Sequence, residues 1–126
     1  MPRLILLIVG VLYIANGLTM WFAPQYWYDT TPGVAAMGPF NLHFIRDIAL
    51  AYAVMGGGLL WGRRDVSVGM FACIWPALHA VYHIAIFFNR GMLIDIVSAT
   101  NLFLIQIPAW ASFWAVWRLR QAQSAK

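Results

Sequence analysis

Charged residues are scarce in this chain of 126 residues. It has no glutamate, and charged residues make up only 10% of it, against roughly 25% in soluble globular proteins. A water-soluble fold of this size cannot cover its surface with so few charges, and 63% of the residues are hydrophobic. Both numbers indicate an integral membrane protein. We interpret the net charge of +4 as a signal of membrane topology and expect no nucleic-acid partner.

Several sequence signals of other structures are also missing. The chain has one cysteine, Cys73, which excludes an internal disulfide, and no C-x-x-C-H sequence that would attach haem covalently. Its apolar runs lack the alternation typical of transmembrane β-strands. No nucleophile-elbow or phosphate-binding motif occurs. What remains is an all-α protein in which any chemistry depends on a few polar side chains.

Long apolar runs dominate the rest of the sequence. A transmembrane helix needs about 20 mostly apolar residues, and four segments qualify, at about residues 4–22, 41–61, 66–88 and 92–117. The short connections after the second and third segments make neighbouring helices antiparallel. We therefore expect a single membrane domain over residues 1–126, built as an antiparallel bundle of four transmembrane helices.

Basic residues gather on one side of this predicted bundle. Arg46 falls within or beside a helix and is left out of the count. If the N-terminus is inside, the outer side then holds only Arg90, and the inner side holds Arg3, Arg63, Arg64, Arg118, Arg120 and Lys126. Because cytoplasmic loops of membrane proteins are enriched in Lys and Arg, the sequence predicts that both termini are cytoplasmic.

Ionisable side chains fall at similar depths in two of the predicted helices. His43 and Asp47 lie near the outer end of the second helix, and His79 and His83 lie in the outer half of the third. Each pair is spaced i,i+4, which places both side chains on one helix face. Ionisable residues inside membranes usually face the bundle interior and pair with one another. We therefore expect these four residues to form a polar site in the outer half of the bundle.

Further polar groups are expected around this site. We place Arg46, Asp95, Asn16 and Tyr82 in a second layer, and we expect Arg46 to pair with Asp95 or with a loop carbonyl. Trp75 is also expected to line the site. The longest connection, residues 23–40, can cover its outer mouth or remain a plain interfacial loop.

The four central residues leave several chemistries open. Three imidazoles and a carboxylate suit copper, iron or zinc, so His43, Asp47, His79 and His83 form a candidate metal site. Non-covalent haem or a quinone is a second possibility. Acid–base chemistry on a lipid-like substrate is a third, because a histidine near an aspartate can transfer a proton. Alternatively, these polar groups only join helices by hydrogen bonds.

A family resemblance rests on a few motifs, which include Asn41-Leu42-His43-Phe44-Ile45-Arg46-Asp47 and the Ala77-x-His79-x3-His83 pattern of the third helix. The chain resembles a group of small, uncharacterised bacterial membrane proteins that are loosely DoxX-like. This resemblance implies four helices and a location in the bacterial inner membrane, and in DoxX-like relatives a link to quinone or thiol redox chemistry has been suggested. It brings no catalytic role to any residue here.

A different class of function is also compatible with the sequence. The chain is small, has no soluble domain and carries abundant aromatic residues. It can therefore be a structural accessory subunit of a larger membrane complex. In either case the expected partners are the lipid bilayer and other membrane subunits or further copies of the chain.

Overall fold

The computed structural model describes residues 1–125, and within them every regular element is a helix. Four of its helical segments are long and apolar enough to cross a membrane. This confirms the predicted all-α architecture with four transmembrane segments. The long segments are α1 (Pro2–Phe22), α4 (Leu42–Gly62), α5 (Val66–Asn89) and a fourth that joins α6 (Ile96–Thr100), the π-helix η1 (Asn101–Gln106) and α7 (Ile107–Ser124).

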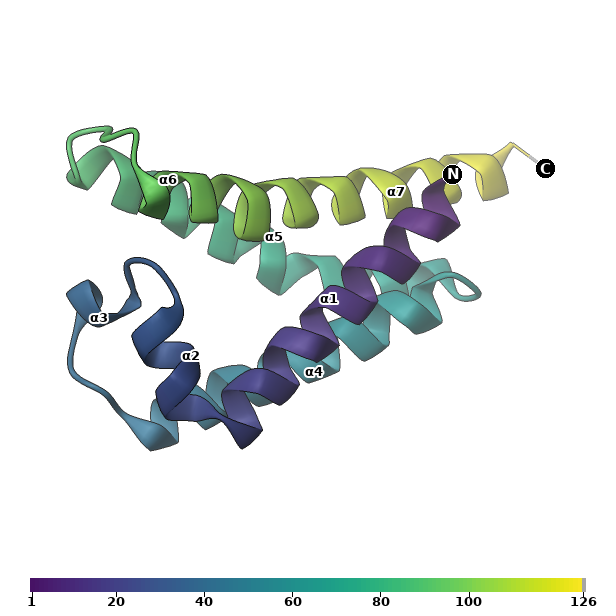
Figure 1. Ribbon diagram of the computed structural model, residues 1–126. Helices are drawn as coiled ribbons and strands as arrows, with labels where there is room; N and C mark the ends of the chain where they lie inside the picture. Colours follow the sequence, from purple (N-terminus) through teal and green to yellow (C-terminus); the bar gives the residue numbers. More distant parts are fainter. Residues whose placement is uncertain (126) are drawn as a thin grey trace.

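The four spans are arranged as two pairs. Helix α1 packs along α4, and α5 packs along the fourth span, so that the two pairs form the arms of a V (Figure 1). The arms meet where the two chain ends and the α4–α5 turn lie, which we call the termini end. They separate toward the opposite, or loop, end. That end carries the connection with the short helices α2 (Pro24–Thr30) and α3 (Val34–Met37).

Side-chain caps account for where the two central helices begin. Asn41 accepts a hydrogen bond from the backbone N–H of Phe44 at 3.0 Å, and Asp65 accepts one from the N–H of Ser67 at 2.9 Å. Such bonds satisfy N–H groups that have no partner within the first helical turn. These caps explain why α4 starts at Leu42 and α5 starts at Val66.

Small residues hold α1 and α4 together. A Cβ built on Gly17 would lie 2.7 Å from the carbonyl oxygen of Ala49, and one built on Gly10 would lie 2.9 Å from that of Gly56. The two contacts are seven residues apart on both helices, so they form one continuous seam. Packing of this kind is typical of membrane helices, where small residues let two backbones approach closely.

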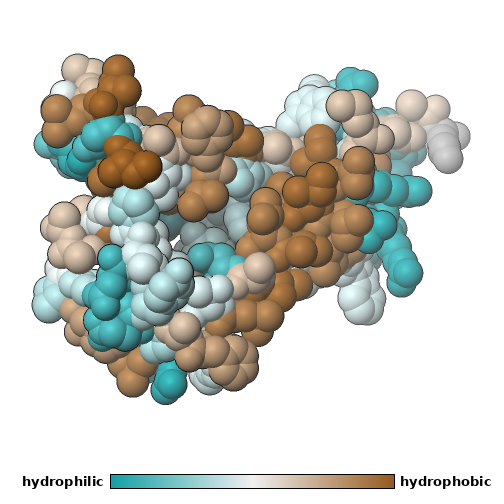
Figure 2. All heavy atoms as spheres, viewed as in Figure 1, coloured by the Kyte–Doolittle hydropathy of each residue, from teal (hydrophilic) through white to brown (hydrophobic). Residues whose placement is uncertain are grey.

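The tightly packed core lies toward the termini end. The surface around it is largely apolar, as contact with lipid requires: Figure 2 shows hydrophobic side chains over the middle of α1 and α7, with hydrophilic groups beyond them at the termini end. The core comprises Leu6, Val9, Tyr13, Leu59, Val66, Ala72, Cys73, Ala115 and Val116.

Candidate functional site

A cavity of about 960 Å³ occupies the space between the two arms at the loop end. All four spans contribute to its wall, and so does the connection between α1 and α4. Pockets that bind small ligands typically have volumes of about 300–1,000 Å³ and are mostly apolar, with a few polar groups that orient the ligand. The cavity matches this description in size and in its lining, which includes many aromatic and aliphatic side chains.

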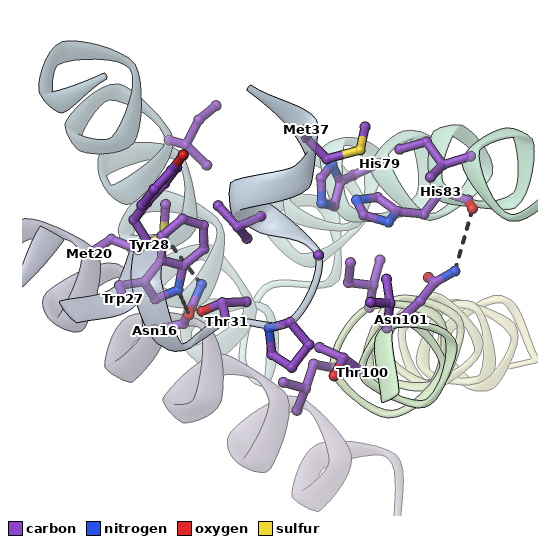
Figure 3. Close-up of a pocket in the computed structure, with 18 of the residues that line it drawn as sticks. Asn16, Met20, Trp27, Tyr28, Thr31, Met37, His79, His83, Thr100 and Asn101 are labelled. Atoms are coloured by element: carbon purple, nitrogen blue, oxygen red, sulfur yellow. Dashed lines mark hydrogen bonds between the residues drawn. The ribbon is translucent and has the colours of Figure 1, made fainter. Parts of the chain in front are cut away.

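Two histidines of α5 face this cavity. The imidazoles of His79 and His83 lie with ring centroids 4.6 Å apart, both half-buried in the cavity wall (Figure 3). Their i,i+4 spacing places them on one helix face, as the sequence predicts. No hydrogen bond to either ring occurs within residues 1–125, and neither ring is among the side chains with a fully enclosed, unpartnered polar atom. Their nitrogens are therefore open to the cavity.

Aromatic rings continue this pair toward the core. The imidazole of His79 stacks on the indole of Trp75, with centroids 4.8 Å apart and ring planes 8° apart. Tyr52 of α4 meets Trp75 edge-on at 5.2 Å, and Tyr13 of α1 meets Tyr52 edge-on at 5.4 Å. These contacts join three helices at the base of the V and hold the His79 ring in one orientation.

The fourth span faces the histidines with amide side chains. Gln106 donates from Nε2 to the carbonyl oxygen of Ala80 at 2.8 Å. Asn101 donates from Nδ2 to the carbonyl oxygen of His83 at 3.4 Å (Figure 3). Both amides lie in η1, and π-helical turns occur frequently at functional sites. Gln106 is not part of the cavity wall, but it joins η1 to α5 beside it. Our sequence interpretation missed this contact, although a glutamine inside an apolar run, two residues before Pro108, was a usable signal.

The connection between α1 and α4 covers the loop end of the cavity, and we call residues 24–40 the strap. Its α2 is anchored by a hydrogen bond from Trp27 Nε1 to Asn16 Oδ1 at 3.0 Å. The Tyr28 hydroxyl donates to the carbonyl oxygen of Gly38 at 2.7 Å. Gly33 has a φ of 90°, and a Cβ there would lie 2.7 Å from Val97 Cγ1 of α6. The strap therefore spans from one arm to the other, which is the covering arrangement of the two that the sequence left open.

Several predicted site residues do line the cavity. His79 and His83 come from α5, together with Trp75 and Tyr82. Asn16 comes from α1 and binds the strap through Trp27. Two of the four residues predicted to form the centre of the site, His79 and His83, therefore line one cavity.

The prediction for α4 was wrong about the helix face. His43 and Asp47 are absent from the cavity wall, and their side chains are 89% and 56% exposed, 3.5 Å from each other. The reason is that α4 turns its apolar residues inward: Ile45 is buried, and Ile48 lines the cavity. His43, Asp47 and Arg46 occupy the opposite face.

The predicted metal-ligand set is consequently not assembled. His43 and Asp47 point away from the cavity that His79 and His83 face. Among residues 1–125, no group of three or more His, Cys, Asp or Glu side chains is placed to hold a metal ion. A site made by His43, Asp47, His79 and His83 together is therefore excluded by their positions.

The pairing predicted for Arg46 is also wrong. Its guanidinium carbon lies 5.3 Å from the centroid of the Trp21 ring, a cation–π geometry. Asp95 instead binds Arg90, with Arg90 Nη2 2.6 Å from Asp95 Oδ2. This hydrogen bond, supported by the backbone N–H of Ser98, lowers the pKa of Asp95 to about 2. Arg90 also lines the cavity, and it does so as one half of an ion pair.

Comparisons of the chain with protein-family models, with curated proteins and with solved structures found no match. What the site can bind therefore has to be inferred from its own residues. It offers two imidazoles that can donate or accept hydrogen bonds, flat aromatic walls and an apolar interior. No carboxylate of residues 1–125 lines the cavity. Such a site suits a neutral or anionic molecule better than a cation.

Proposed function

We propose that this chain is a multi-pass protein of the bacterial inner membrane that binds a small amphiphilic or redox-active ligand, of the lipid-like or quinone class, in the loop-end cavity. His79 and His83 bind the polar head of this ligand. The single observation that carries the proposal is the pair of imidazoles whose nitrogens open into a cavity of about 960 Å³. Since unsatisfied polar groups in an apolar environment cost free energy, two open imidazoles favour a ligand that hydrogen-bonds to them.

The shape of the wall supports a ligand with a flat head. The stacked pair of His79 and Trp75 offers a planar surface, and Tyr52 closes it from α4. Ring-shaped head groups with carbonyl or hydroxyl oxygens can stack there and accept hydrogen bonds from the imidazoles. The DoxX-like resemblance is compatible with such a ligand.

The proposal includes an orientation in the membrane. Arg3, Arg63, Arg64, Arg118 and Arg120 lie at the termini end, which we place in the cytoplasm by the positive-inside rule. The cavity then faces the outer half of the bilayer. Labelling of single cysteines tests this orientation. Ser67→Cys and Ala35→Cys are made separately in a Cys73→Ala background, and intact spheroplasts are treated with a membrane-impermeant maleimide. We expect labelling at Ala35→Cys only, and labelling at Ser67→Cys alone would contradict the orientation.

Co-purification tests the ligand itself. The protein is purified in mild detergent, and the small molecules bound to it are extracted and identified by mass spectrometry. We expect an amphiphile that is enriched with the wild-type chain and reduced by about tenfold or more in the double variant His79→Ala/His83→Ala, since two lost hydrogen bonds of about 1 kcal/mol each exceed the 1.4 kcal/mol of a tenfold change.

His43→Ala is the matched control, because it removes the third histidine of the chain from a face that does not line the cavity. It should retain the bound amphiphile at the wild-type level. An extract without any enriched molecule, or equal enrichment in the double variant, would overturn the proposal.

The accessory-subunit hypothesis stays a prediction, and one observation supports it. Most of the surface of each span is not covered by the rest of the chain, so it is free to contact lipid or other membrane proteins. Native gels of solubilised membranes distinguish the two, because an accessory subunit migrates with its complex. A chain that migrates alone while it retains a bound amphiphile favours ligand binding.

A further inference from the structure

The loop-end cavity has a second opening at its side. Leu12 and Ala15 of α1 and Leu104 of η1 all line the cavity, and all three are exposed. Helix α1 packs against α7, nearer the termini end, rather than against α6 or η1. Figure 2 shows a hollow on the face where α1 and the fourth span lie in front. We call this opening between Leu12, Ala15 and Leu104 the side window.

The depth of the window places it inside the hydrocarbon region. Leu12 lies ten residues before the end of α1 at Phe22, or about 15 Å along the helix, and Leu104 lies eight residues after Ile96, or about 12 Å. The hydrocarbon core of a bilayer is about 30 Å thick, so the window opens near its middle. By the same measure His83, six residues before the end of α5 at Asn89, lies about 9 Å deep, and His79, ten residues before it, lies about 15 Å deep. The two imidazoles therefore extend from nearer the loop end down to the depth of the window.

The loop end of the cavity is more obstructed than its side. The strap crosses from Asn16, through Trp27, to Val97 of α6, where Gly33 makes contact. Figure 3 shows Thr31 of the strap between α1 and Thr100 of the fourth span. The window, in contrast, is bordered by aliphatic side chains that hydrocarbon solvates well. A molecule with a long apolar chain is therefore better matched to the side route than to the route past the strap.

We infer that the ligand of this cavity carries a long hydrocarbon chain and enters from the bilayer, with its chain lying in the window between Leu12 and Leu104 and its head at His79 and His83. The inference rests on the proposed function and names the chemical class of its ligand. The depths allow this arrangement, because His83 lies nearer the membrane surface than the window and His79 lies at about the depth of the window.

Photolabelling tests this inference without knowledge of the natural ligand. The probe is a 16-carbon fatty acid with a diazirine near its carboxyl group, added to phosphatidylcholine vesicles that contain the full chain. We expect label on Tyr13 and Met20, which line the cavity and are only 5% and 1% exposed. A lipid chain that stays outside the protein labels outward residues such as Leu18 instead.

Two neighbouring residues provide a matched pair of variants. Leu12 and Val11 are 50% and 51% exposed, but only Leu12 lines the cavity. Leu12→Trp fills the window and should lower the label on Tyr13 and Met20 by about tenfold or more, the change that about 1.4 kcal/mol produces. Val11→Trp adds the same side chain to the lipid-facing surface and should leave this label unchanged.

The outcomes separate this inference from the proposed function. Label confined to outward residues in the wild type, or equal cavity labelling in both tryptophan variants, would overturn the inference even if a bound molecule depends on the histidines. Cavity labelling that is lost in Leu12→Trp, together with an extract that does not depend on His79 and His83, would keep the inference and overturn the proposed role of the imidazoles.

Discussion

The imidazole of His79 lies parallel to the indole of Trp75, with their centroids 4.8 Å apart and their planes 8° apart. The two residues are four apart on α5, so the helix itself brings them together. Tyr52 packs edge-on against both rings, at 5.2 Å from Trp75 and 6.5 Å from His79. One face of the imidazole is thereby fixed, and its nitrogens remain open to the cavity.

This stacked pair should be measurable as a coupling energy. Stacked aromatic pairs contribute about 0.5–1.5 kcal/mol beyond the burial of their area. We expect a double-mutant cycle of Trp75→Leu and His79→Ala, followed by reversible unfolding in mixed detergent micelles, to give a coupling energy in that range. The cycle of Trp75→Leu with His43→Ala is the control, because His43 lies on the outward face of α4 and should be additive within about 0.5 kcal/mol. Equal values in both cycles would contradict the contact.

Two features of the surroundings of this pair were predictable from the sequence. Hydropathy alone identified the four spans, and the spacing of His79 and His83 placed these two residues on one helix face. The same spacing argument failed for His43 and Asp47, because i,i+4 periodicity shows that two residues share a face without showing which way that face turns. A helix start near the membrane surface tolerates polar groups that point outward, since head groups and water can solvate them there.

The signal that orients α4 was present in its small residues. Ala49 and Gly56 are seven residues apart and contact Gly17 and Gly10 of α1, so their face must turn toward α1. The sequence interpretation did not match the small residues of α4 with those of α1. The opening of the bundle into a V was not predictable in this way, because it depends on how the strap and the aromatic side chains fill the loop end.

The seam of small residues predicts that a glycine-to-alanine substitution has opposite effects on stability at two positions. Gly17→Ala places a Cβ 2.7 Å from the Ala49 carbonyl oxygen, and the backbone there cannot move aside easily. We expect it to destabilise the chain by about 1–3 kcal/mol, as overpacking usually does. Gly57→Ala is the control: a Cβ there meets nothing within 4 Å, and alanine favours the helix by roughly 0.5–1 kcal/mol.

Unfolding in mixed micelles measures both glycine variants under the same conditions. The midpoint should move to lower denaturant for Gly17→Ala, and it should stay or rise for Gly57→Ala. If both variants unfold at the wild-type midpoint, the close approach of α1 and α4 is wrong.

The ion pair between Arg90 and Asp95 predicts a pH dependence outside the spans. Because Arg90 binds the carboxylate, the pKa of Asp95 falls from 3.8 to about 2. A lowered pKa in the folded state means that the pair contributes stability above pH 3.8, and this contribution is lost as the pH falls through about 2. We expect Arg90→Gln to raise the pKa of Asp95 toward 3.8, measured by carbon NMR of the aspartate carboxyl groups in micelles.

Arg46→Gln is the control for this titration. It removes the other arginine of the loop end, whose guanidinium lies over Trp21 rather than near Asp95. The pKa of Asp95 should stay near its wild-type value in this variant. A pKa that moves in Arg46→Gln and not in Arg90→Gln would restore the pairing that the sequence suggested.

The strap should loosen when its anchor to α1 is removed. Trp27 donates from Nε1 to Asn16 Oδ1 at 3.0 Å, and Trp27→Phe keeps an aromatic ring while removing this donor. Since a hydrogen bond between membrane helices contributes about 0.6 kcal/mol and up to about 1.7 kcal/mol, the amides of the strap should exchange with solvent faster by roughly threefold to twentyfold.

Tyr26→Phe is the control, because Tyr26 is 64% exposed and does not line the cavity. Hydrogen exchange followed by mass spectrometry compares the two variants over residues 31–40. Unchanged exchange in Trp27→Phe would mean that the contact of Gly33 with Val97 and the bond from Tyr28 to Gly38 hold the strap without the indole.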